Sequence, residues 1–503
     1  MAARGDWREG LPADAGRDSL PAEVGAIRHD SRAVQAGDVF VCVVGERADG
    51  HDFAASAVEA GAAALVAQTG RGEQLTDLGV PVVEVPDSRR ALSEIAAAHE
   101  GYPARRLTVV GVTGTDGKST TSYLTLAALE GCGLTAGVLT TVGTRIAGRD
   151  LPNATRLTTQ EAPEVQRLLA EMVEAGCTHA VVEATSHGLA LHRLDDCEFD
   201  IAVLTNLSPD HLDFHGTFEA YRAAKAKLFR MLDQPTHKRT HRAAVLNADS
   251  PEWRHFARAT SKQVVTYALD NADADVRAEE VMLWPDGATF VLTTEEESLE
   301  ASIRLPGRFN VANAAAAVTV AGALRLDAMA AAAGVAACRG VPGRMERIEG
   351  APFEVVVDYA HTPEAMRQVL EALREVVEGR LIVVFGCAGE RSRDRRTGLG
   401  SVAARLADFA VLTEEDPRSE PSEAIIEEIA RAMSSAGAQE GERFERVTDR
   451  RAAIDRALAL AKPGDLVLLA GKGHESTIER SGGPVPWDER EVARQLIAAR
   501  FRA

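Results

Sequence analysis

Short apolar runs alternate with helical patterns along most of this sequence, and that alternation leaves few possible folds. Between residues 107 and 340, β-type runs such as LTVVGV, THAVVEA, DIAVLTN and AAVLNA alternate with helical runs such as STTSYLTLAALEG and EAYRAAKAKLFRML. Strands and helices that follow one another in this way favour a parallel sheet covered by helices. The sequence therefore predicts an α/β protein whose central part is a doubly wound sheet.

The chain is long enough for several domains. Its 503 residues exceed what one core usually organises, so about three domains are expected. Residues 24–104 carry the pattern of a small α/β domain that ends at the linker-like GYPARR. The central domain should span residues 105–340 and include an antiparallel hairpin around Pro285-Asp286-Gly287. Residues 341–503 alternate again, which predicts a Rossmann-like domain, but one without the glycine fingerprint of a dinucleotide site.

Composition excludes some classes of function. A net charge of −19 argues against a nucleic-acid binder, which needs a basic face. No run approaches about 18 uninterrupted apolar residues, so no membrane span is expected. The first residues carry acids and no apolar segment, unlike a signal peptide, and residues 1–23 look like a flexible leader. Six scattered cysteines without a Cys-x-x-Cys pair indicate buried thiols in a reducing compartment, which predicts a cytoplasmic protein.

The stretch GVTGTDGKSTT follows the first apolar run of the central domain and has the composition of a phosphate-binding loop. Gly114 and Gly117 permit a tight turn, and a helix starting near Lys118 would aim its backbone N–H groups and dipole at one point. Lys118 offers a charge to phosphate, and the Ser119 hydroxyl suits Mg²⁺. The strict Walker A pattern has glycine where Val112 stands. An ordinary glycine-rich turn is the alternative, but Gly-Lys-Ser-Thr favours a nucleotide.

Other chemistry-bearing residues follow neighbouring apolar runs. Glu183 ends a predicted buried strand, where it could bind Mg²⁺ or cap a helix. His211, Asp213 and His215 share one loop and could form a metal cluster, although Mg²⁺ prefers oxygen and a loop histidine usually serves hydrogen bonds. Lys225 lies in a helical pattern, and its spacing alone assigns it to the solvated face.

Further polar positions lie near the end of the central domain and in the loops of the last domain. Asn310 enters a helix, where it could act as a cap or reach a purine edge. Asp358 stands at a predicted strand end, a position that commonly meets a ribose hydroxyl. The motifs EEDPR and GKGHE both follow apolar strands, so both should face one sheet edge. Arg418 would suit a carboxylate there, while Lys472 and Glu475 offer one charge of each sign.

Taken together and in order, these motifs resemble the Mur ligase family, the ATP-dependent amide-forming enzymes of peptidoglycan synthesis. The resemblance runs from about residue 24 to the C-terminus and is carried by DSRAVQAGDVFV, GVTGTDGKSTT, TTQE, EATSHGLALHR, TNLSPDHLDFHG, YRAAKAKLF, GRFNVANAAAA, VPGRME, VDYAHTPEAM, EEDPR and GKGHE. It implies a three-domain enzyme that adds the third stem residue, a diamino acid, to UDP-MurNAc-L-Ala-D-Glu through an acyl phosphate. The implied cofactors are ATP and two Mg²⁺ ions. The expected partners are these small molecules alone, without nucleic acid or membrane, for a monomeric protein.

The resemblance also assigns roles to matching positions. Catalysis would involve Lys118, Glu183, His211 and Lys225. Magnesium would be held by Ser119, Glu183, His211 and a carbamate formed on Lys225, because a neutral lysine amine that takes up CO₂ becomes a carboxylate. ATP would contact Gly114, Thr115, Asp116, Gly117, Lys118, Ser119, Thr120, Asn310, Arg344 and Asp358. The sugar nucleotide would contact Ser31, Thr158, Thr159, Thr185 and Arg193. The incoming amino acid would contact Arg391, Asp416, Arg418, Gly471 and Glu475.

The sequence departs from the family pattern at a few of these positions. Asp116 stands where asparagine is usual, and Leu191 where some members have a glutamine that touches the substrate. Asp416 stands where members that add meso-diaminopimelate typically have asparagine. Arg418 suits a second carboxylate on the incoming residue, whereas Asp416 suits a terminal ammonium, so meso-diaminopimelate, lysine and ornithine all stay open. The rival interpretations are another Mur or folylpolyglutamate-type ligase and a nucleotide-binding scaffold that has lost catalysis.

Overall fold

The structure, a computed structural model, is divided into two compact units that we describe separately. The first unit contains Met1–Val276 and Ala316–Gly334, and the second contains Arg277–Ala315 and Val335–Ala503. The α/β class with a large, mainly parallel central sheet is confirmed, and the boundaries of three domains remain a prediction. The described residues are 5–13, 17–45, 48–151, 159–390 and 392–501.

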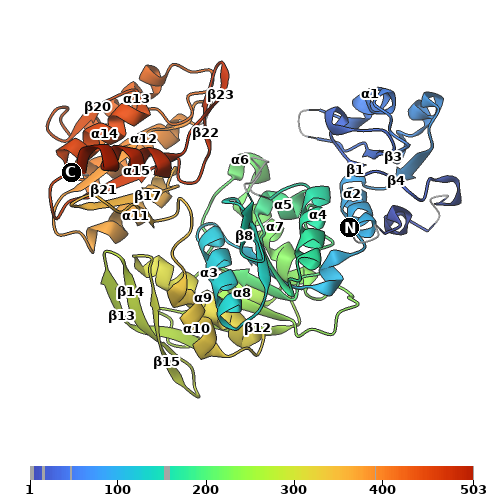
Figure 1. The fold of residues 1–503 in the computed structure, drawn as a ribbon, viewed down its shortest axis with the longest axis horizontal. Coiled ribbons are helices and arrows are strands. Elements are labelled where there is room, and N and C mark those ends of the chain that lie inside the picture. Colours follow the sequence, from blue (N-terminus) through green and yellow to red (C-terminus); the bar gives the residue numbers. More distant parts are fainter. Residues whose placement is uncertain (1–4, 14–16, 46–47, 152–158, 391, 502–503) are drawn as a thin grey trace. The chain divides into compact units, whose positions relative to one another are not determined.

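The first unit begins with a small parallel sheet, drawn in blue in Figure 1. Its strands lie in chain order, and β2 is buried along its whole length because helices cover both faces of a parallel sheet. The predicted linker forms a short 3₁₀ helix, Pro103–Arg106. The elements are β1 (Ile27–Arg28), β2 (Val39–Val41), β3 (Ala64–Gln68), β4 (Val82–Val85), α1 (Ala54–Glu59) and α2 (Ser88–His99).

The larger sheet of the first unit carries the phosphate-loop motif. Its strand order is β12-β11-β10-β5-β9-β6-β7-β8, and the pairs from β12 to β6 are parallel. The antiparallel strands β7 and β8 extend one edge and had no signal in the sequence analysis. The strands are β5 (Thr108–Thr113), β6 (Ala136–Leu139), β7 (Thr144–Ile146), β8 (Arg149–Leu151), β9 (His179–Glu183), β10 (Ile201–Leu204), β11 (Ala243–Asn247) and β12 (Gln263–Ala268).

Helices separate these strands, and buried apolar side chains fill the space between helices and sheet. Strands β5, β9 and β10 are neighbours, so the loops that follow Thr113, Glu183 and Leu204 leave the sheet at one edge. The helices are α3 (Lys118–Gly131), α4 (Ala162–Glu174), α5 (Ser186–Ala190), α6 (Leu212–His215), α7 (Phe218–Met231) and α8 (Trp253–Ala257).

The second unit begins with three antiparallel strands. Trp284 pairs with Gly287 across the turn between β13 and β14, which confirms the predicted hairpin. The alanine-rich tract that follows forms two helices. The elements are β13 (Val276–Trp284), β14 (Gly287–Thr293), β15 (Ser298–Ile303), α9 (Arg308–Ala323) and α10 (Ala328–Ala337), of which Ala316–Gly334 belongs to the first unit.

The C-terminal part of the second unit is a six-stranded sheet in the order β16-β17-β21-β18-β19-β20. All its pairs are parallel except β16 with β17, so the loops after β17, β21, β18 and β19 share one edge. A separate hairpin, β22-β23, follows the β21 loop. Figure 1 draws this part in orange and red. Its strands are β16 (Glu346–Arg347), β17 (Glu354–Asp358), β18 (Leu381–Phe385), β19 (Phe409–Leu412), β20 (Phe444–Arg446), β21 (Leu466–Ala470), β22 (Thr477–Arg480) and β23 (Gly483–Pro486), and its helices are α11 (Pro363–Arg374), α12 (Arg393–Leu406), α13 (Ser422–Ser435), α14 (Arg450–Leu460) and α15 (Glu489–Phe501).

Two sequence expectations concern the whole chain. Across the described residues, no helix combines the length and apolar character that a membrane crossing requires. The six cysteines are free thiols, as expected, although Cys132 and Cys338 are partly exposed rather than buried.

Candidate active site

The glycine-bearing loop between β5 and α3 is held in place by the segment that follows β10. Gly114 has φ +153°, and a Cβ atom there would lie 1.8 Å from Thr205 Oγ1, so the close approach requires glycine. The Thr115 amide donates to the Asn206 carbonyl (3.0 Å), and the Thr115 hydroxyl donates to the Ser208 carbonyl (3.0 Å). The loop therefore has a fixed path. The contacts of Thr205, Asn206 and Ser208 with this loop were not predicted from the sequence.

Asp116, the unusual residue of this loop, has a firmly anchored backbone. Its amide donates to Asn206 Oδ1 (2.9 Å), and its carbonyl accepts from Thr205 Oγ1 (2.6 Å). The loop thus keeps its path with aspartate at this position. Its side chain is half-buried, and its charge counteracts the lowering of the Lys225 pKa.

Glu183 lies beside the start of α3. It ends β9 opposite Val112 of β5, a register that brings its carboxylate to the phosphate-type loop. Ser119 Oγ donates to Glu183 Oε2 (2.8 Å), and the Thr141 amide and hydroxyl donate to the same carboxylate at 3.0 and 3.1 Å. Glu183 is 3% exposed. Hydroxyl and carboxylate oxygens gathered in this way are the donors that Mg²⁺ prefers. Thr141 was not predicted as a site residue. Its position just after β6, at the same edge of the sheet, is the feature that could have identified it.

Lys225 is buried, which corrects the expectation from helical spacing that it lies on the solvated face. It follows Tyr221 by one turn of α7, and its Nζ lies 4.6 Å from the centre of the Tyr221 ring. Nζ donates to the Gly114 carbonyl (2.6 Å), so α7 brings this lysine against the loop. Burial, followed by the nearby charge of Lys118, lowers the pKa of Lys225 well below its ordinary value. The prediction from helical spacing was wrong because the long side chain of a lysine can cross an apolar face and reach a polar partner.

His211 belongs to a group of rings at the same edge. It has φ +51° and lies just before α6, with its ring 4.8 Å from that of His187 and 6.5 Å from that of Tyr221. Burial lowers the pKa of His211, which favours the neutral imidazole. Within the described part of the chain, no three His, Cys, Asp or Glu side chains are grouped to hold a metal ion. His211, Asp213 and His215 therefore share a loop without forming such a group.

Three of the predicted sugar-nucleotide residues, Thr159, Thr185 and Arg193, form a connected polar group. Thr159 Oγ1 and Thr185 Oγ1 are 2.7 Å apart, and Thr185 caps α5 by accepting from the Gly188 amide. Arg193 donates to the Thr159 carbonyl (2.9 Å) and pairs with Glu161 at 2.5 Å. Ser31 begins a 3₁₀ turn, Ser31–Ala33, near the end of β1, and Thr158 lies outside the described residues.

The second unit contains the other predicted nucleotide residues. Asp358 ends β17 and accepts from the Met345 and Ala360 amides, each at 2.8 Å. The Arg344 guanidinium lies over the Tyr359 ring at 4.6 Å, and its buried Nε has no hydrogen-bond partner among the described residues. Asn310 is buried in α9. Its side-chain Nδ2 donates to the Pro306 carbonyl (2.8 Å), and its Oδ1 accepts from the Asn313 side chain.

The loops after β19 and β21 meet through ion pairs. The Lys472 ammonium lies 2.8 Å from Asp416 Oδ1 and 2.5 Å from Glu475 Oε2. Gly471 has φ +104°, and a Cβ there would lie 2.7 Å from the Glu415 carboxylate. Arg418 has φ +55°, and its amide donates to the Glu479 carbonyl. Arg391 lies outside the described residues.

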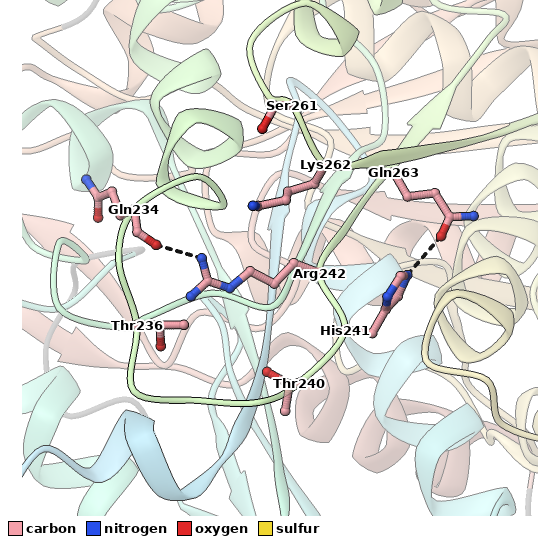
Figure 2. Close-up of a pocket in the computed structure, with 8 residues that line it drawn as sticks. All are labelled: Gln234, Thr236, Thr240, His241, Arg242, Ser261, Lys262 and Gln263. Carbon is pink, nitrogen blue, oxygen red and sulfur yellow. Dashed lines mark hydrogen bonds between the residues drawn. The ribbon is translucent and has the colours of Figure 1, made fainter.

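A polar cavity of about 510 Å³ lies at the opposite edge of the large sheet, where β11 and β12 begin. Arg242 donates to the Gln234 carbonyl, and His241 is hydrogen-bonded to Gln263 (Figure 2). Among the described residues, none of the predicted site residues lines this cavity. This cavity therefore lies apart from the loops that contain the predicted site residues of the large sheet.

Comparison with known proteins gives the family. Three family models match in chain order: "Mur ligase family, catalytic domain" over residues 23–100, "Mur ligase middle domain" over 112–321, and "Mur ligase, glutamate ligase domain" over 343–473. A UDP-N-acetylmuramyl-tripeptide synthetase of Roseiflexus sp. is 47% identical over 489 residues, with 95% of each chain covered.

Two further relatives agree. A UDP-N-acetylmuramoyl-L-alanyl-D-glutamate–2,6-diaminopimelate ligase of Streptomyces coelicolor is 44% identical, with 95% of this chain and 93% of the relative covered. A solved structure of a ligase with the same description superimposes with a TM-score of 0.68 and 33% identity over 99% of both chains. The chain belongs to the Mur ligase family of ATP-dependent, ADP-forming amide ligases.

Proposed function

We propose that this enzyme adds the third residue, a diamino acid, to UDP-MurNAc-L-Ala-D-Glu in the cytoplasm during peptidoglycan synthesis. The observation that carries the proposal is similarity over nearly the whole chain to relatives named for this reaction. Relatives named for 2,6-diaminopimelate support meso-diaminopimelate among the candidate amino acids. A monomer suffices for the proposal, because each substrate has candidate contacts within one chain.

In the first unit, the loop from Gly114 to Thr120 would hold the ATP phosphates. Backbone amides at the start of α3 and the Lys118 ammonium offer positive potential to the phosphate oxygens. Thr159, Thr185 and Arg193 would hold the sugar nucleotide together with Ser31 and Thr158. Their mutual hydrogen bonds, where described, support a preformed polar surface.

The residues around Ser119 fit magnesium. The Ser119 hydroxyl and the Glu183 carboxylate already share a hydrogen bond in a buried position, and both are hard oxygen donors. A bound Mg²⁺ would supply positive charge that offsets the charge of the phosphate oxygens. We propose two such ions, the second near His211 and Lys225.

The surroundings of Lys225 are compatible with a carbamate on its side chain. Its Nζ is buried beside the loop carbonyl of Gly114, where burial disfavours the ammonium form. A neutral amine attacks CO₂ and releases one proton to water, which leaves a carbamate whose single negative charge is shared by two oxygens. Those oxygens would lie near Asp116, Lys118 and Tyr221, the groups that already contact or act on Lys225.

The reaction would proceed in two steps. A free carboxylate oxygen of the D-glutamyl residue attacks the γ-phosphorus of ATP, which releases ADP and forms an acyl phosphate. The α-amine of the incoming amino acid then attacks the acyl carbon, loses a proton, and expels inorganic phosphate as the amide forms. Lys118 neutralises charge on the phosphate, and positioning supplies most of the acceleration.

In the second unit, Asn310, Arg344 and Asp358 would contact the nucleoside and phosphates of ATP. The unpartnered Nε of Arg344 supports a role toward an anion. The loops after β18, β19 and β21, which contain Arg391, Asp416, Arg418, Gly471 and Glu475, would hold the incoming amino acid.

The proposal is tested by measuring phosphate release from ATP with the purified enzyme. We expect release only when UDP-MurNAc-L-Ala-D-Glu and a diamino acid are both present, with one amide product formed per phosphate. Omission of either substrate is the control. No release with meso-diaminopimelate, lysine or ornithine would favour the catalytically lapsed scaffold, and release with D-Ala-D-Ala or a folate substrate would favour another ligase of the superfamily.

A further inference from the structure

Lys472 is fully buried between two carboxylates of the proposed amino-acid site. Its ammonium lies 2.8 Å from Asp416 on the β19 loop and 2.5 Å from Glu475 on its own β21 loop. The other oxygen of Glu475 accepts from the Tyr359 hydroxyl (3.1 Å), and Asp416 Oδ1 also accepts from the Glu479 amide (2.8 Å). Both carboxylates are thus fixed by groups of the protein itself.

Arg418, the other cation of these loops, is not enclosed by carboxylates as Lys472 is. It lies two residues after Asp416, and its amide is anchored on the Glu479 carbonyl (2.9 Å). Within the described residues, no carboxylate lies at ion-pair distance from its guanidinium, which is only half-buried. The charge of Arg418 acts on the Glu390 carboxylate without forming an ion pair with it, whereas Asp416 has the Lys472 ammonium at contact distance.

We infer that Lys472 masks the charge of Asp416 and thereby sets the selectivity of the site for the distal end of the incoming amino acid. This inference rests on the proposed function. The ammonium opposes the field of Asp416 at contact distance, and because it is shared with Glu475 the three groups together carry one net negative charge rather than two. The guanidinium of Arg418 then determines selectivity, and it favours a distal carboxylate over a lone ammonium.

This arrangement gives Lys472 a positioning role rather than a catalytic one. Without its ammonium, Asp416 and Glu475 would present negative charge with no cation at contact distance. They would attract the side-chain ammonium of lysine or ornithine and repel the second carboxylate of meso-diaminopimelate. The substitution of asparagine by aspartate in the EEDPR motif is therefore compatible with meso-diaminopimelate as long as Lys472 is present.

The test compares kcat/KM for meso-diaminopimelate, lysine and ornithine in four forms of the full-length enzyme: wild type, Asp416→Asn, Lys472→Met and the double variant. We expect Asp416→Asn to leave the ratio of diaminopimelate to lysine within about threefold of wild type. We expect Lys472→Met to move the ratio toward lysine by about tenfold or more, and the double variant to restore it.

A control separates selectivity from general loss of stability. Lys238 forms a buried pair with Asp200 at 2.6 Å in the first unit, outside the proposed site. Lys238→Met should lower the unfolding midpoint without moving the ratio. If Lys472→Met does not fold, Lys472→Gln removes the same charge while keeping a hydrogen-bond donor to Asp416 and Glu475, and the same shift of the ratio toward lysine is expected.

Three outcomes would overturn the inference. A tenfold gain in diaminopimelate preference in Asp416→Asn would mean that Asp416 acts directly on the substrate, and an unchanged ratio in folded Lys472→Met would mean that Lys472 masks nothing. No ligation by the wild type with any of the three amino acids would instead overturn the proposed function, and this inference with it.

Discussion

The burial of the Lys225 side chain is set by its position on α7 rather than by its residue type. A lysine on a helix is ordinarily solvated and charged, yet this one is 2% exposed and donates to the Gly114 carbonyl. Lys227, two residues later, keeps an ion pair with Asp195 at 2.6 Å instead. The two side chains point to different faces of α7, because successive helical residues are about 100° apart.

We expect Lys225→Ala to lose activity on the order of 100-fold, because the proposed carbamate oxygens would be absent. Added acetate should restore part of that activity by supplying a carboxylate to the vacated space. Steady-state phosphate release measures both effects, and ¹³C NMR with labelled bicarbonate should detect a carbamate in the wild type.

Lys227→Ala is the matched control and should retain activity. A wild-type enzyme without a carbamate signal, together with an active Lys225→Ala variant, would refute the carbamate.

At the scale of elements, one buried ion pair joins the parts that support the amino-acid loops. Arg450 begins α14, and Glu489 begins α15; both side chains are fully buried and 2.7 Å apart. Arg450 also donates to the Glu414 carbonyl (2.9 Å) and the Ala470 carbonyl (2.7 Å), which lie at the start of the two loops. The pair therefore couples two helices to two strand ends.

We expect Arg450→Met to lower the free energy of unfolding by about 3–5 kcal/mol, because it leaves the Glu489 carboxylate buried without a cation, with the Trp487 indole N–H still donating to it. Arg450→Met combined with Glu489→Met should recover most of that loss, since no charge is then buried alone. Urea unfolding measures the stability. In variants that remain folded, KM for the amino acid should rise more than kcat falls, as expected for displaced loops.

Strictly additive losses in the double variant would contradict the pairing. An unchanged KM in folded Arg450→Met would contradict the link to the loops.

At the scale of the whole molecule, stability depends on pH through buried acids. Burial raises the pKa of Glu415 to about 7 from an ordinary value of 4.5, against the opposing charges of Lys472 and Arg450. Because the folded pKa is raised, the native state binds the proton more tightly than the unfolded chain. This contribution to stability is full below the unfolded pKa and is lost as pH rises through the folded pKa.

We expect the free energy of unfolding of the wild type, relative to Glu415→Gln, to fall by up to about 3 kcal/mol between about pH 4.5 and 7. Urea titrations across that range measure the difference. Glu423→Gln, at an exposed position of α13, should show no such dependence. A difference that is flat with pH, or that rises, would show that Glu415 does not titrate in this way.

The order of strands and helices was readable from the sequence, because apolar periodicity reports which local structure can bury its side chains. The strand ends at Glu183 and Asp358 and the hairpin turn at Gly287 were found in this way. The antiparallel strands β7 and β8 were not, since they are short and carry polar residues. The loop at Gly114 was identified from its composition, but its contacts with Thr205 and Ser208 were not.

The sequence by itself determined the fold class, the phosphate-type loop and the polar loops at strand ends, because those features depend on local pattern and residue chemistry. The tertiary structure alone decided that Lys225 is buried, that Thr141 joins Ser119 at Glu183, and that Lys472 is paired with Asp416. Each of these contacts joins residues from different elements, and strand order and helix packing bring such residues together. A pattern along the chain cannot report which distant charge will lie beside a given one, so the ion pair on which the proposed selectivity rests is a tertiary property.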